Sequence, residues 1–424
     1  MLIINPGLES TQYIFYLQLQ IRFHQNLNKS SMSRKERFAF IILSAIAAAL
    51  WILLGWSYLT DSWLAPLGPV LDKSSLITTS TPTHSSSPAV RATSTNPVTT
   101  SVSSELPTTS PIEPLNNQTP FCNGPVSMNI LAIGSDTRAQ NYLYGLADVI
   151  RYIRVDFVTP GINVLEFPRD LWVEIPGISD HYGITHGKLN QAYFYGNPGM
   201  GYYDGLGSGP GLLAQTLSSN YGAHIDHYLA VNMHTFVNLV NAVGGIDIFL
   251  PFSVDARKTD QSHRSDLFFA PGDHHLSGEQ ALMLGRIREY SVFARADQQN
   301  RIMCSLKEKL LSPRVIPKIP EIIQTFSGAI QTDLSPQQIS QLVCLMPQIK
   351  SGDITFTTFP RELLTETRTY DIGVKKDVYI FKADNNTLRL FVQQFDQGKW
   401  PVRNQTTSPT EPVRPRGEGT FSCP

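Results

Sequence analysis

The fold is decided by a stretch whose three segments read MNILAIGSDTR at residues 128–138, ADVIRYIRVDFV at 147–158 and INVLEFPRD at 162–170. Each segment contains a short run of β-branched and other apolar residues, and each run is followed or flanked by charged residues. Glycine and proline lie between the segments. This pattern is typical of β-strands joined by turns. Polar groups at the ends of such strands lie where open α/β sheets place their sites, so the sequence predicts an α/β fold with a site at one edge of the sheet.

Four charged residues at the ends of these runs form the candidate site. Asp136 and Asp148 supply hard carboxylate oxygens, which suit an Mg²⁺ ion that keeps waters and bridges phosphate oxygens. Arg138 and Arg169 supply planar guanidinium groups that match phosphate oxygens. Any one of the four could be an ordinary charge on a surface turn. Their recurrence at the ends of neighbouring strands favours a shared site for phosphate and metal.

The composition limits the class of protein. The 424 residues include 34 basic and 35 acidic residues, and the resulting net charge of −1 gives no electrostatic case for nucleic acid as a partner. A hydrophobic content of 42% is enough to build a sizeable core. Any anion-binding surface must therefore be local.

The sequence predicts one membrane span near the N-terminus. Residues 38–59 are apolar and uncharged, which is enough for one helix to cross a bilayer. Three basic residues at 34–37 precede this span, so the positive-inside rule places residues 1–37 in the cytoplasm and the rest of the chain outside. No cleavage site of small residues follows, so we expect an uncleaved anchor. Met32 is an alternative start to Met1.

After the span, we expect a stalk and one globule. Residues 60–120 are dominated by Ser, Thr and Pro from residue 73 onward, which predicts a disordered stalk that holds the domain away from the membrane. Residues 121–311 are predicted to form the main domain. An α/β cap of the same globule is expected at 312–396, followed by a loose tail at 397–424.

Three further features have more than one interpretation. The glycine-rich segment 196–211 precedes a predicted helix at 212–219 and is interpreted as a mobile lid or a connector, with a phosphate cradle as the minority alternative. His224 and His227 lack a matching third ligand, so they are interpreted as polar residues at a strand start. Arg286 and Arg288 share a face only if the backbone is extended. They would then form a diphosphate clamp, and a solvated basic edge is the alternative.

Four cysteines lie beyond the predicted span. An even number of cysteines in an oxidising compartment indicates two disulfides. We expect the pairs Cys304–Cys344 and Cys122–Cys423, which are one of three possible arrangements.

Seven motifs together resemble the LytR-CpsA-Psr (LCP) family of bacterial cell-envelope phosphotransferases. In chain order they are GSDTR at 134–138, AD at 147–148, PRD at 168–170, KLNQAY at 188–193, VGGI at 243–246, LSGEQAL at 276–282 and RIR at 286–288. The set follows the family's order and spacing and is highly specific, although it covers under half of the chain.

The resemblance implies a three-layer α/β/α sandwich with a central mixed sheet and a long apolar pocket for a polyprenyl chain. It implies a membrane-anchored, extracytoplasmic enzyme that moves a glycopolymer from polyprenyl pyrophosphate onto peptidoglycan or another wall acceptor, with release of polyprenyl phosphate. Asp136 and Asp148 would hold Mg²⁺ or Mn²⁺. We expect a monomer.

The resemblance also assigns roles to residues outside the metal pair. The expected catalytic residues are Asp136, Asp148, Arg138, Arg169 and Arg295. The expected substrate-binding residues are Arg169, Asp170, Lys188, Asn190, Arg286, Arg288, Arg295 and Gln299.

The chain departs from the family pattern at two positions. Val292 stands where the family usually has Asp, and Gln298 stands where it usually has a second Arg. Loss of the carboxylate could remove a base or an arginine-orienting partner, and Asp297 or Arg301 could substitute for the lost group. The alternative function is therefore a binding protein on the same fold, which holds the polyprenyl-linked glycopolymer without transferring it.

Overall fold

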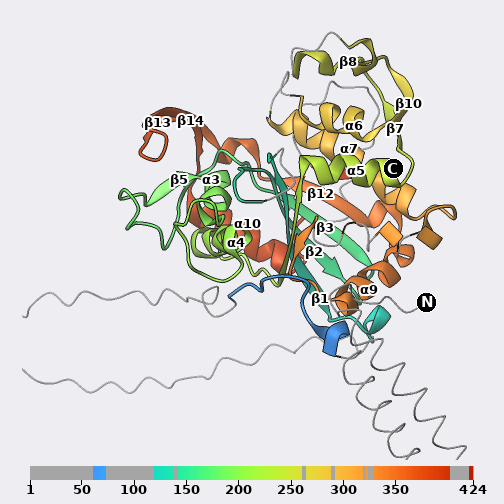
Figure 1. The fold of residues 1–424 in the computed structure, drawn as a ribbon, viewed down its shortest axis with the longest axis horizontal. Helices are drawn as coiled ribbons and strands as arrows, with labels where there is room; N and C mark the ends of the chain where they lie inside the picture. Colours follow the sequence, from blue (N-terminus) through green and yellow to red (C-terminus); the bar gives the residue numbers. More distant parts are fainter. Residues whose placement is uncertain are drawn as a thin grey trace, which may run out of the picture. The chain divides into compact units, whose positions relative to one another are not determined.

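In a computed structural model of the protein, the three apolar runs form neighbouring strands in the middle of one sheet (Figure 1). The predicted membrane helix at 38–59 lies outside the described residues, as does most of the predicted stalk. Within the described residues, no helix is long and apolar enough to cross a bilayer. Residues 1–65 and 66–424 form two separate units, and every element below belongs to the second. The structure describes residues 61–72, 119–137, 142–259, 264–287, 292–318, 321–322, 326, 329–401 and 420–423.

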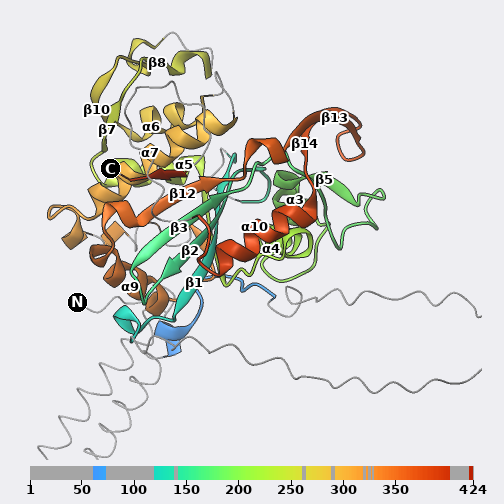
Figure 2. The same cartoon turned by 180° about the vertical axis from the view of Figure 1, so that it is seen from behind.

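The central sheet has seven strands in the order β11–β6–β1–β2–β3–β12–β15 (Figures 1 and 2). Strand β1 pairs parallel with β6, and β3 pairs parallel with β12, while the other neighbours are antiparallel. The predicted α/β fold with a central mixed sheet is thus confirmed. The strands are β1 (Ser127–Ser135), β2 (Ala147–Asp156), β3 (Gly161–Glu166), β6 (His227–Asn232), β11 (Gln331–Thr332), β12 (Ile354–Thr358) and β15 (Thr420–Ser422).

Both faces of the sheet are buried, because its strands carry apolar residues at successive positions. On β1, Leu131 belongs to one hydrophobic cluster and Ile130 to another. On β2, Tyr152 belongs to the first cluster and Val155 to the second. Successive side chains of a strand point to opposite faces, so a nearly continuous apolar run needs cover on both sides.

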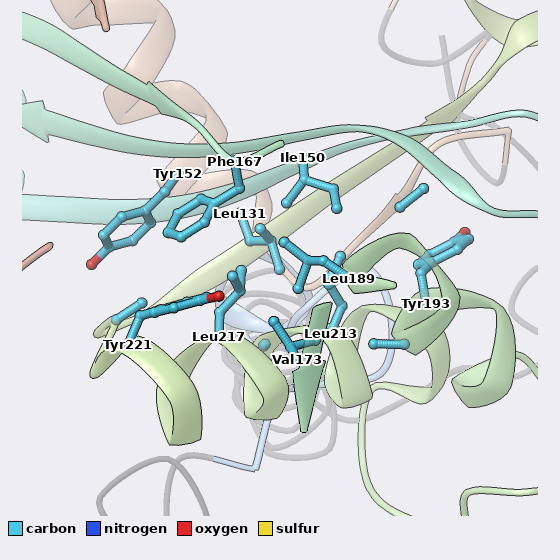
Figure 3. Packing of buried hydrophobic residues seen from close by; sticks show 14 of the residues in the cluster. Leu131, Ile150, Tyr152, Phe167, Val173, Leu189, Tyr193, Leu213, Leu217 and Tyr221 are labelled. Carbon is cyan, nitrogen blue, oxygen red and sulfur yellow. The ribbon is translucent and has the colours of Figure 1, made fainter. Parts of the chain in front are cut away.

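Three helices cover the first face: α3 (Leu189–Gly196), α4 (Ser208–Tyr221) and α10 (Asn385–Asp396). Figure 3 shows Ile150 and Phe167 on the sheet side facing Leu213 and Leu217 of α4. On α10, Leu388, Val392 and Phe395 are fully buried in the same cluster.

Helix α4 starts four residues earlier than predicted. The sequence predicts a helix at 212–219, because the glycines before it read as a loop. In the structure these small residues let α4 lie against α3: a Cβ on Gly209 would come 2.8 Å from the backbone oxygen of Tyr193. The helix ends at Gly222, whose φ of 73° is a left-handed conformation that glycine adopts without strain.

The second face is covered by α7 (Val292–Leu310) and α9 (Pro336–Leu345). A further cluster joins part of α7 to a set of smaller elements, seen together in Figure 2. These are α5 (Met233–Ala242), α6 (Gly278–Gly285), β7 (Ile246–Leu250), β8 (Val254–Asp255), β9 (Phe268–Phe269) and β10 (Gly272–Leu276). Two more strand pairs form separate two-stranded sheets. One joins β4 (Trp172–Glu174) to β5 (His186–Lys188), and the other joins β13 (Thr365–Asp371) to β14 (Lys376–Lys382).

The C-terminal part of the chain is built into the main sheet. Strand β12, from the predicted cap at 312–396, lies between β3 and β15. The tail 397–424 is expected to be loose, but residues 420–422 pair with β12 as β15. The sequence could not show this, because a three-residue edge strand has too little pattern to be recognised.

The predicted disulfide pairing is wrong. The bridges join Cys122 to Cys344 and Cys304 to Cys423, with Cα–Cα distances of 5.9 and 5.6 Å. Cys122 lies in a short 3₁₀ helix beside α9, which carries Cys344. Cys304 lies on α7 and is buried with Cys423, which follows β15. Packing of α7 and α9 on the sheet therefore decides the pairing.

We expect the free energy of unfolding of the Cys304→Ser, Cys423→Ser double variant to be about 2–4 kcal/mol lower than that of the native chain, because the bridge closes a long loop in the unfolded chain. Chemical denaturation under non-reducing conditions measures the change. Peptide mapping of the unreduced protein should recover the Cys122–Cys344 pair in the variant. Recovery of Cys122 bonded to Cys423 in the native chain would contradict the pairing.

A buried acid on α10 links stability to pH. The single hydroxyl proton of Tyr152 is shared between Asp396 Oδ1 and the backbone oxygen of His224, both within hydrogen-bond distance. Burial raises the pKa of Asp396 to about 6, although the Tyr152 hydrogen bond and the charges of His224 and Arg154 act to lower it. Because the pKa is higher in the folded chain than in the unfolded one, the contribution is present at low pH and is lost as pH rises through about 6.

Between pH 4 and pH 7, Asp396 is therefore expected to reduce the free energy of unfolding by about 2–3 kcal/mol, at about 1.4 kcal/mol per pKa unit. Asp396→Asn, which keeps an acceptor for Tyr152, should flatten this part of the pH–stability curve. Denaturation at a series of pH values measures the slope, and Asp377→Asn at an exposed position is the matched control. Equal slopes in the two variants would refute the assignment.

Candidate functional site

The predicted site residues meet at one edge of the sheet. Strand β1 runs antiparallel to β2 and β2 antiparallel to β3, so the ends of β1 and β3 and the start of β2 share one edge. Asp136 follows β1, Asp148 is the second residue of β2, and Arg169 and Asp170 follow β3. The structure thus brings these four residues to one edge of the sheet, as the strand ends predict.

These residues line a cavity of about 980 Å³. The charged and polar residues of its wall are Asp136, Asp148, Arg169, Asp170, Lys188, Asn190, Gln191, Asp371, Lys375 and Lys376. The other residues of its wall are mostly apolar or aromatic, and they are Leu146, Tyr182, Ile184, Phe194, Tyr195, Met200, Tyr202, Ile372, Gly373, Val374 and Val378. A cavity lined by both kinds of side chain suits a ligand that joins an anionic group to an apolar one.

An alternating row of acids and bases forms the charged wall. Arg169 Nη1 pairs with Asp148, and Arg169 Nε lies 3.3 Å from Asp170 Oδ2. Lys188 Nζ lies 2.7 Å from the other oxygen of Asp170. Burial acts to lower the pKa of Arg169, but the charges of Asp148 and Asp170 outweigh it and raise that pKa. Arg169 therefore stays cationic and is oriented from both sides.

The backbone around Arg169 is fixed by two other elements. A turn forms at Pro168, whose oxygen accepts a hydrogen bond of 3.1 Å from the backbone nitrogen of Leu171. The oxygen of Arg169 accepts one from the nitrogen of Asn190, near the start of α3, and the oxygen of Asp170 accepts one from Phe381 of β14. The two charged side chains therefore start from a rigid support.

Asp136 is held by the loop that joins β1 to β2. The backbone nitrogen of Leu146 donates to Asp136 Oδ1 at 2.7 Å, and the nitrogen of Asp136 donates to the oxygen of Leu146 at 3.0 Å. Gly145 makes this loop possible, with a φ of 135° and no room for a side chain, since a Cβ there would lie 2.0 Å from Thr137 Oγ1. The loop thus fixes the carboxylate on the cavity wall.

The turn of the β13–β14 hairpin closes the far wall. Asp371 accepts hydrogen bonds from Gln191 Nε2 of α3 at 2.8 Å and from the nitrogen of Gly373 at 2.8 Å. A Cβ on Gly373 would lie 2.0 Å from the Tyr195 hydroxyl, so the turn is in close contact with the aromatic wall. Burial, followed by the charge of Asp371, raises the pKa of Tyr195 to about 12. The hairpin is not among the predicted site elements, because a hairpin turn carries no sequence signal for a distant cavity.

A second, small cavity of about 20 Å³ adjoins the first and contains Arg295 of α7. Asp148, Arg169 and Asp170 line both cavities. Glu166, at the end of β3, also lines the smaller one. The predicted association of Arg295 with the site is therefore present, on the α7 side of Arg169.

Arg151 and Glu166 form a buried pair that the sequence analysis missed. Arg151 Nη2 lies 3.1 Å from Glu166 Oε2 and 3.5 Å from Gln299 Oε1. Arg151 is only 5% exposed. A charged residue inside an apolar strand was the available signal, because such a residue is rarely buried without a partner. Gln299, which is predicted to bind substrate, contacts Arg151 of this pair. It lines neither of the two cavities.

Other predicted residues are placed differently. Arg286 lies at the end of α6, with Nη1 3.8 Å from Met283 Sδ, and lines neither cavity. Its φ and ψ of −98° and −4° are helical, so the extended clamp predicted for 286–288 is wrong at this residue. Arg138 and Arg288 lie outside the described residues.

The altered segment lies on α7. Val292 is the first residue of this helix. Gln298 is buried, and its Oε1 has no hydrogen-bond partner among the described residues. Arg301 lies over the ring of Phe421, and neither it nor Asp297 lines either cavity. The cavity walls therefore give no support to the hypothesis that Asp297 or Arg301 replaces the groups missing from the family pattern.

The donor set for a metal ion is small. In the part of the chain that the structure describes, no group of three or more His, Cys, Asp or Glu side chains is arranged to hold a metal. Asp136 and Asp148 nevertheless line the same cavity as hard oxygen donors. Mg²⁺ is commonly bound by one or two carboxylates together with substrate phosphates and waters, so this pair fits such an ion. His227 contacts Gln338 and Asp333, in agreement with its interpretation as a polar residue at a strand start.

The glycine-rich segment 196–211 connects α3 to α4, and two of its side chains line the cavity. Met200 and Tyr202 line the apolar side, and Tyr202 stacks on Tyr195 with ring centroids 5.8 Å apart. The contribution comes from side chains, which disfavours a phosphate cradle made by the glycine backbone.

Comparison with known proteins agrees with this geometry. The chain is 28% identical over 263 residues to the polyisoprenyl-teichoic acid–peptidoglycan teichoic acid transferase TagV of Bacillus subtilis, which covers 61% of each chain. It is 30% identical over 222 residues to the TagU transferase of Oceanobacillus iheyensis, covering 51% of this chain and 62% of that one. The alignments thus span less than two thirds of either relative.

Among solved structures, protein gbs0355 of Streptococcus agalactiae matches with a TM-score of 0.50 and 20% identity, covering 66% of this chain and 90% of that one. This likeness concerns the fold. The sequence profile of the LytR_cpsA_psr family matches residues 92–391, which include every residue of the two cavities. The chain therefore belongs to the LytR_cpsA_psr family.

Proposed function

We propose that the protein is a membrane-anchored, extracytoplasmic phosphotransferase that moves a glycopolymer from polyprenyl pyrophosphate onto peptidoglycan or another wall acceptor. An acceptor hydroxyl forms a bond to the phosphorus that carries the glycan. The bond from that phosphorus to the polyprenyl phosphate breaks, and polyprenyl phosphate leaves. The hydroxyl proton passes to a carboxylate of the cavity.

The observation that carries this proposal is that charged and apolar side chains together line one cavity of about 980 Å³. Phosphoryl transfer requires positioning and charge neutralisation more than covalent chemistry from the protein. Arg169 and Lys188 supply positive charge for a pyrophosphate, and Asp170 positions both of them. The apolar wall offers a surface to the start of the polyprenyl chain. The names of the TagV and TagU relatives support the same class of donor.

Asp136 and Asp148 would hold Mg²⁺ or Mn²⁺, which would supply further charge neutralisation at the phosphate oxygens. In the described structure Asp148 pairs with Arg169. Arg169 also contacts Asp170, so it keeps one carboxylate partner when Asp148 turns toward another ligand.

The alternative is a protein that binds the same glycolipid without transferring it. Two observations favour this alternative. Gln298 replaces an arginine of the family pattern, which removes one positive charge, and it is buried with Oε1 lacking a described partner. Arg286 keeps its charge but lines neither cavity.

One experiment tests the proposal and separates it from the alternative. The full chain in vesicles is incubated with a polyprenyl-pyrophosphate oligosaccharide, a wall acceptor and Mg²⁺, and release of polyprenyl phosphate is followed. Transfer should give one lipid phosphate for each oligosaccharide attached to the acceptor. Tight binding of the lipid without release would establish the binding protein instead. A chain that shows no binding and no release would refute both functions.

A further inference from the structure

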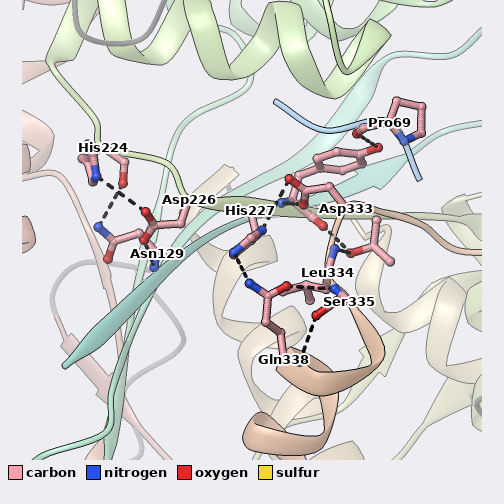
Figure 4. A network of polar contacts seen from close by, with 11 residues as sticks. Pro69, Asn129, His224, Asp226, His227, Asp333, Leu334, Ser335 and Gln338 are labelled. Atoms are coloured by element: carbon pink, nitrogen blue, oxygen red, sulfur yellow. Dashed lines mark hydrogen bonds and ion pairs between the residues drawn. The ribbon is translucent and has the colours of Figure 1, made fainter. Parts of the chain in front are cut away.

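A short segment next to the predicted span is docked on the domain. We call residues 66–72 the docked segment. The nitrogen of Leu67 donates a hydrogen bond of 3.2 Å to the oxygen of Leu334. The hydroxyl of Tyr228 donates one of 2.9 Å to the oxygen of Pro69, drawn as a dashed line at Pro69 in Figure 4. The segment therefore lies along the edge of the sheet where β6 and β11 pair.

Close packing adds to these hydrogen bonds. Leu71 is 4% exposed and belongs to the same cluster as the helices α3 and α4. A Cβ on Gly68 would lie 2.7 Å from the backbone oxygen of Thr332, so the segment approaches β11 closely. Burial of one leucine and two hydrogen bonds to the domain are the contacts of a docked segment and not of a free linker.

The position of this segment in the chain changes the interpretation of the stalk. The predicted span ends at residue 59, and only residues 60–65 separate it from the docked segment. Six residues reach at most about 20 Å, at about 3.3–3.6 Å per residue. The Ser/Thr/Pro-rich residues 73–118 come after the docked segment, so their length does not set the distance between the span and the domain.

Exposed apolar residues lie on the docked segment and beside it. Leu67 is 51% exposed, Val70 is 43% exposed and Leu206 is 55% exposed. Leu206 precedes Gly207, where a Cβ would lie 3.1 Å from Leu71 Cδ2, so it belongs to the same region. We call these three residues the apolar face. In the sequence, Trp63 lies between the span and this face, and tryptophan is enriched at the surface of bilayers.

We propose that the apolar face lies on the outer surface of the membrane and that the docked segment, not the stalk, sets the height of the domain. The inference rests on the anchor that is part of the proposed function. Tyr202, which lines the cavity, lies four residues before Leu206. The segment that carries Leu206 therefore also contributes a side chain to the cavity, and contact of Leu206 with the bilayer would bring this part of the cavity toward a polyprenyl donor in the membrane.

The test compares one insertion at two positions in the full chain, reconstituted into vesicles. Twenty Gly/Ser residues are inserted either between Ala65 and Pro66 or between Pro97 and Val98. Such an insert has an average span of about 25 Å. A fluorophore on Leu206→Cys reports contact with nitroxide-labelled lipids through quenching. A fluorophore on Phe249→Cys, at an exposed site on β7, is the matched control.

Without an insertion, lipid quenching at position 206 should exceed that at position 249 at least twofold. The insertion before Pro66 should remove more than half of the quenching at 206, and the insertion after Pro97 should leave it unchanged. Equal losses for the two insertions, or equal quenching at 206 and 249, would overturn this inference alone. A chain that does not float with the vesicles would overturn the anchor as well. Transferase activity enters none of these measurements.

Discussion

Arg169→Ala is expected to lower the rate of glycopolymer transfer by about 10²–10³-fold, the range for loss of one donor to a developing charge. Arg169 is the cation shared by both cavities, and two carboxylates hold its guanidinium in place. Its removal takes away a planar fork that matches phosphate oxygens. Release of polyprenyl phosphate under saturating donor measures the effect.

Two further variants make this result specific. Arg169→Lys keeps the charge but loses the fork, so it should recover only part of the activity. Arg257→Ala, at an exposed pair with Asp255, should leave transfer unchanged. Equal activity of Arg169→Ala and the native chain would remove Arg169 from the site.

Asp136→Asn is expected to lower Mg²⁺-dependent transfer by a similar factor, about 10²–10³-fold. The amide keeps an oxygen that can accept the hydrogen bond from Leu146, so the loop should remain in place. The lost negative charge weakens a site that has only two carboxylates. Activity is measured over a range of Mg²⁺ concentrations.

If Asp136 binds the metal, the Asp136→Asn variant should also show a changed dependence on Mg²⁺. The Mg²⁺ concentration for half-maximal activity should rise, and high Mg²⁺ should recover part of the rate. Thermal unfolding of the variant should match that of the native chain. A lower rate with an unchanged Mg²⁺ dependence would show that Asp136 acts in another way.

The sequence predicts the centre of the fold well, because the signals there are local. Each of β1, β2 and β3 is an apolar run bounded by turn residues, and their antiparallel order follows from short connections. That order is enough to bring Asp136, Asp148 and Arg169 to one edge. The motif at 188–193 adds Lys188 and Asn190, whose positions depend on the start of α3.

The remaining parts of the site depend on contacts between distant segments. Asp371 reaches the cavity because Gln191, 180 positions earlier in the chain, binds it. No local pattern encodes that distance. Disulfide pairing has the same character: the even number of cysteines predicts two bridges, but the packing that directs Cys304 to Cys423 and Cys344 to Cys122 joins distant segments.

The two outermost strands of the central sheet have a consequence for self-association. Strand β11 has two residues and β15 has three, and both pair antiparallel with longer neighbours. A long bare edge offers backbone groups on which another chain can add a strand, and very short edge strands are a common protection against this. The bridge from Cys304 to Cys423 ties β15 covalently to α7. In a reducing environment that tie is lost, the edge of β12 becomes a template, and intermolecular strand exchange becomes the expected route to insoluble protein.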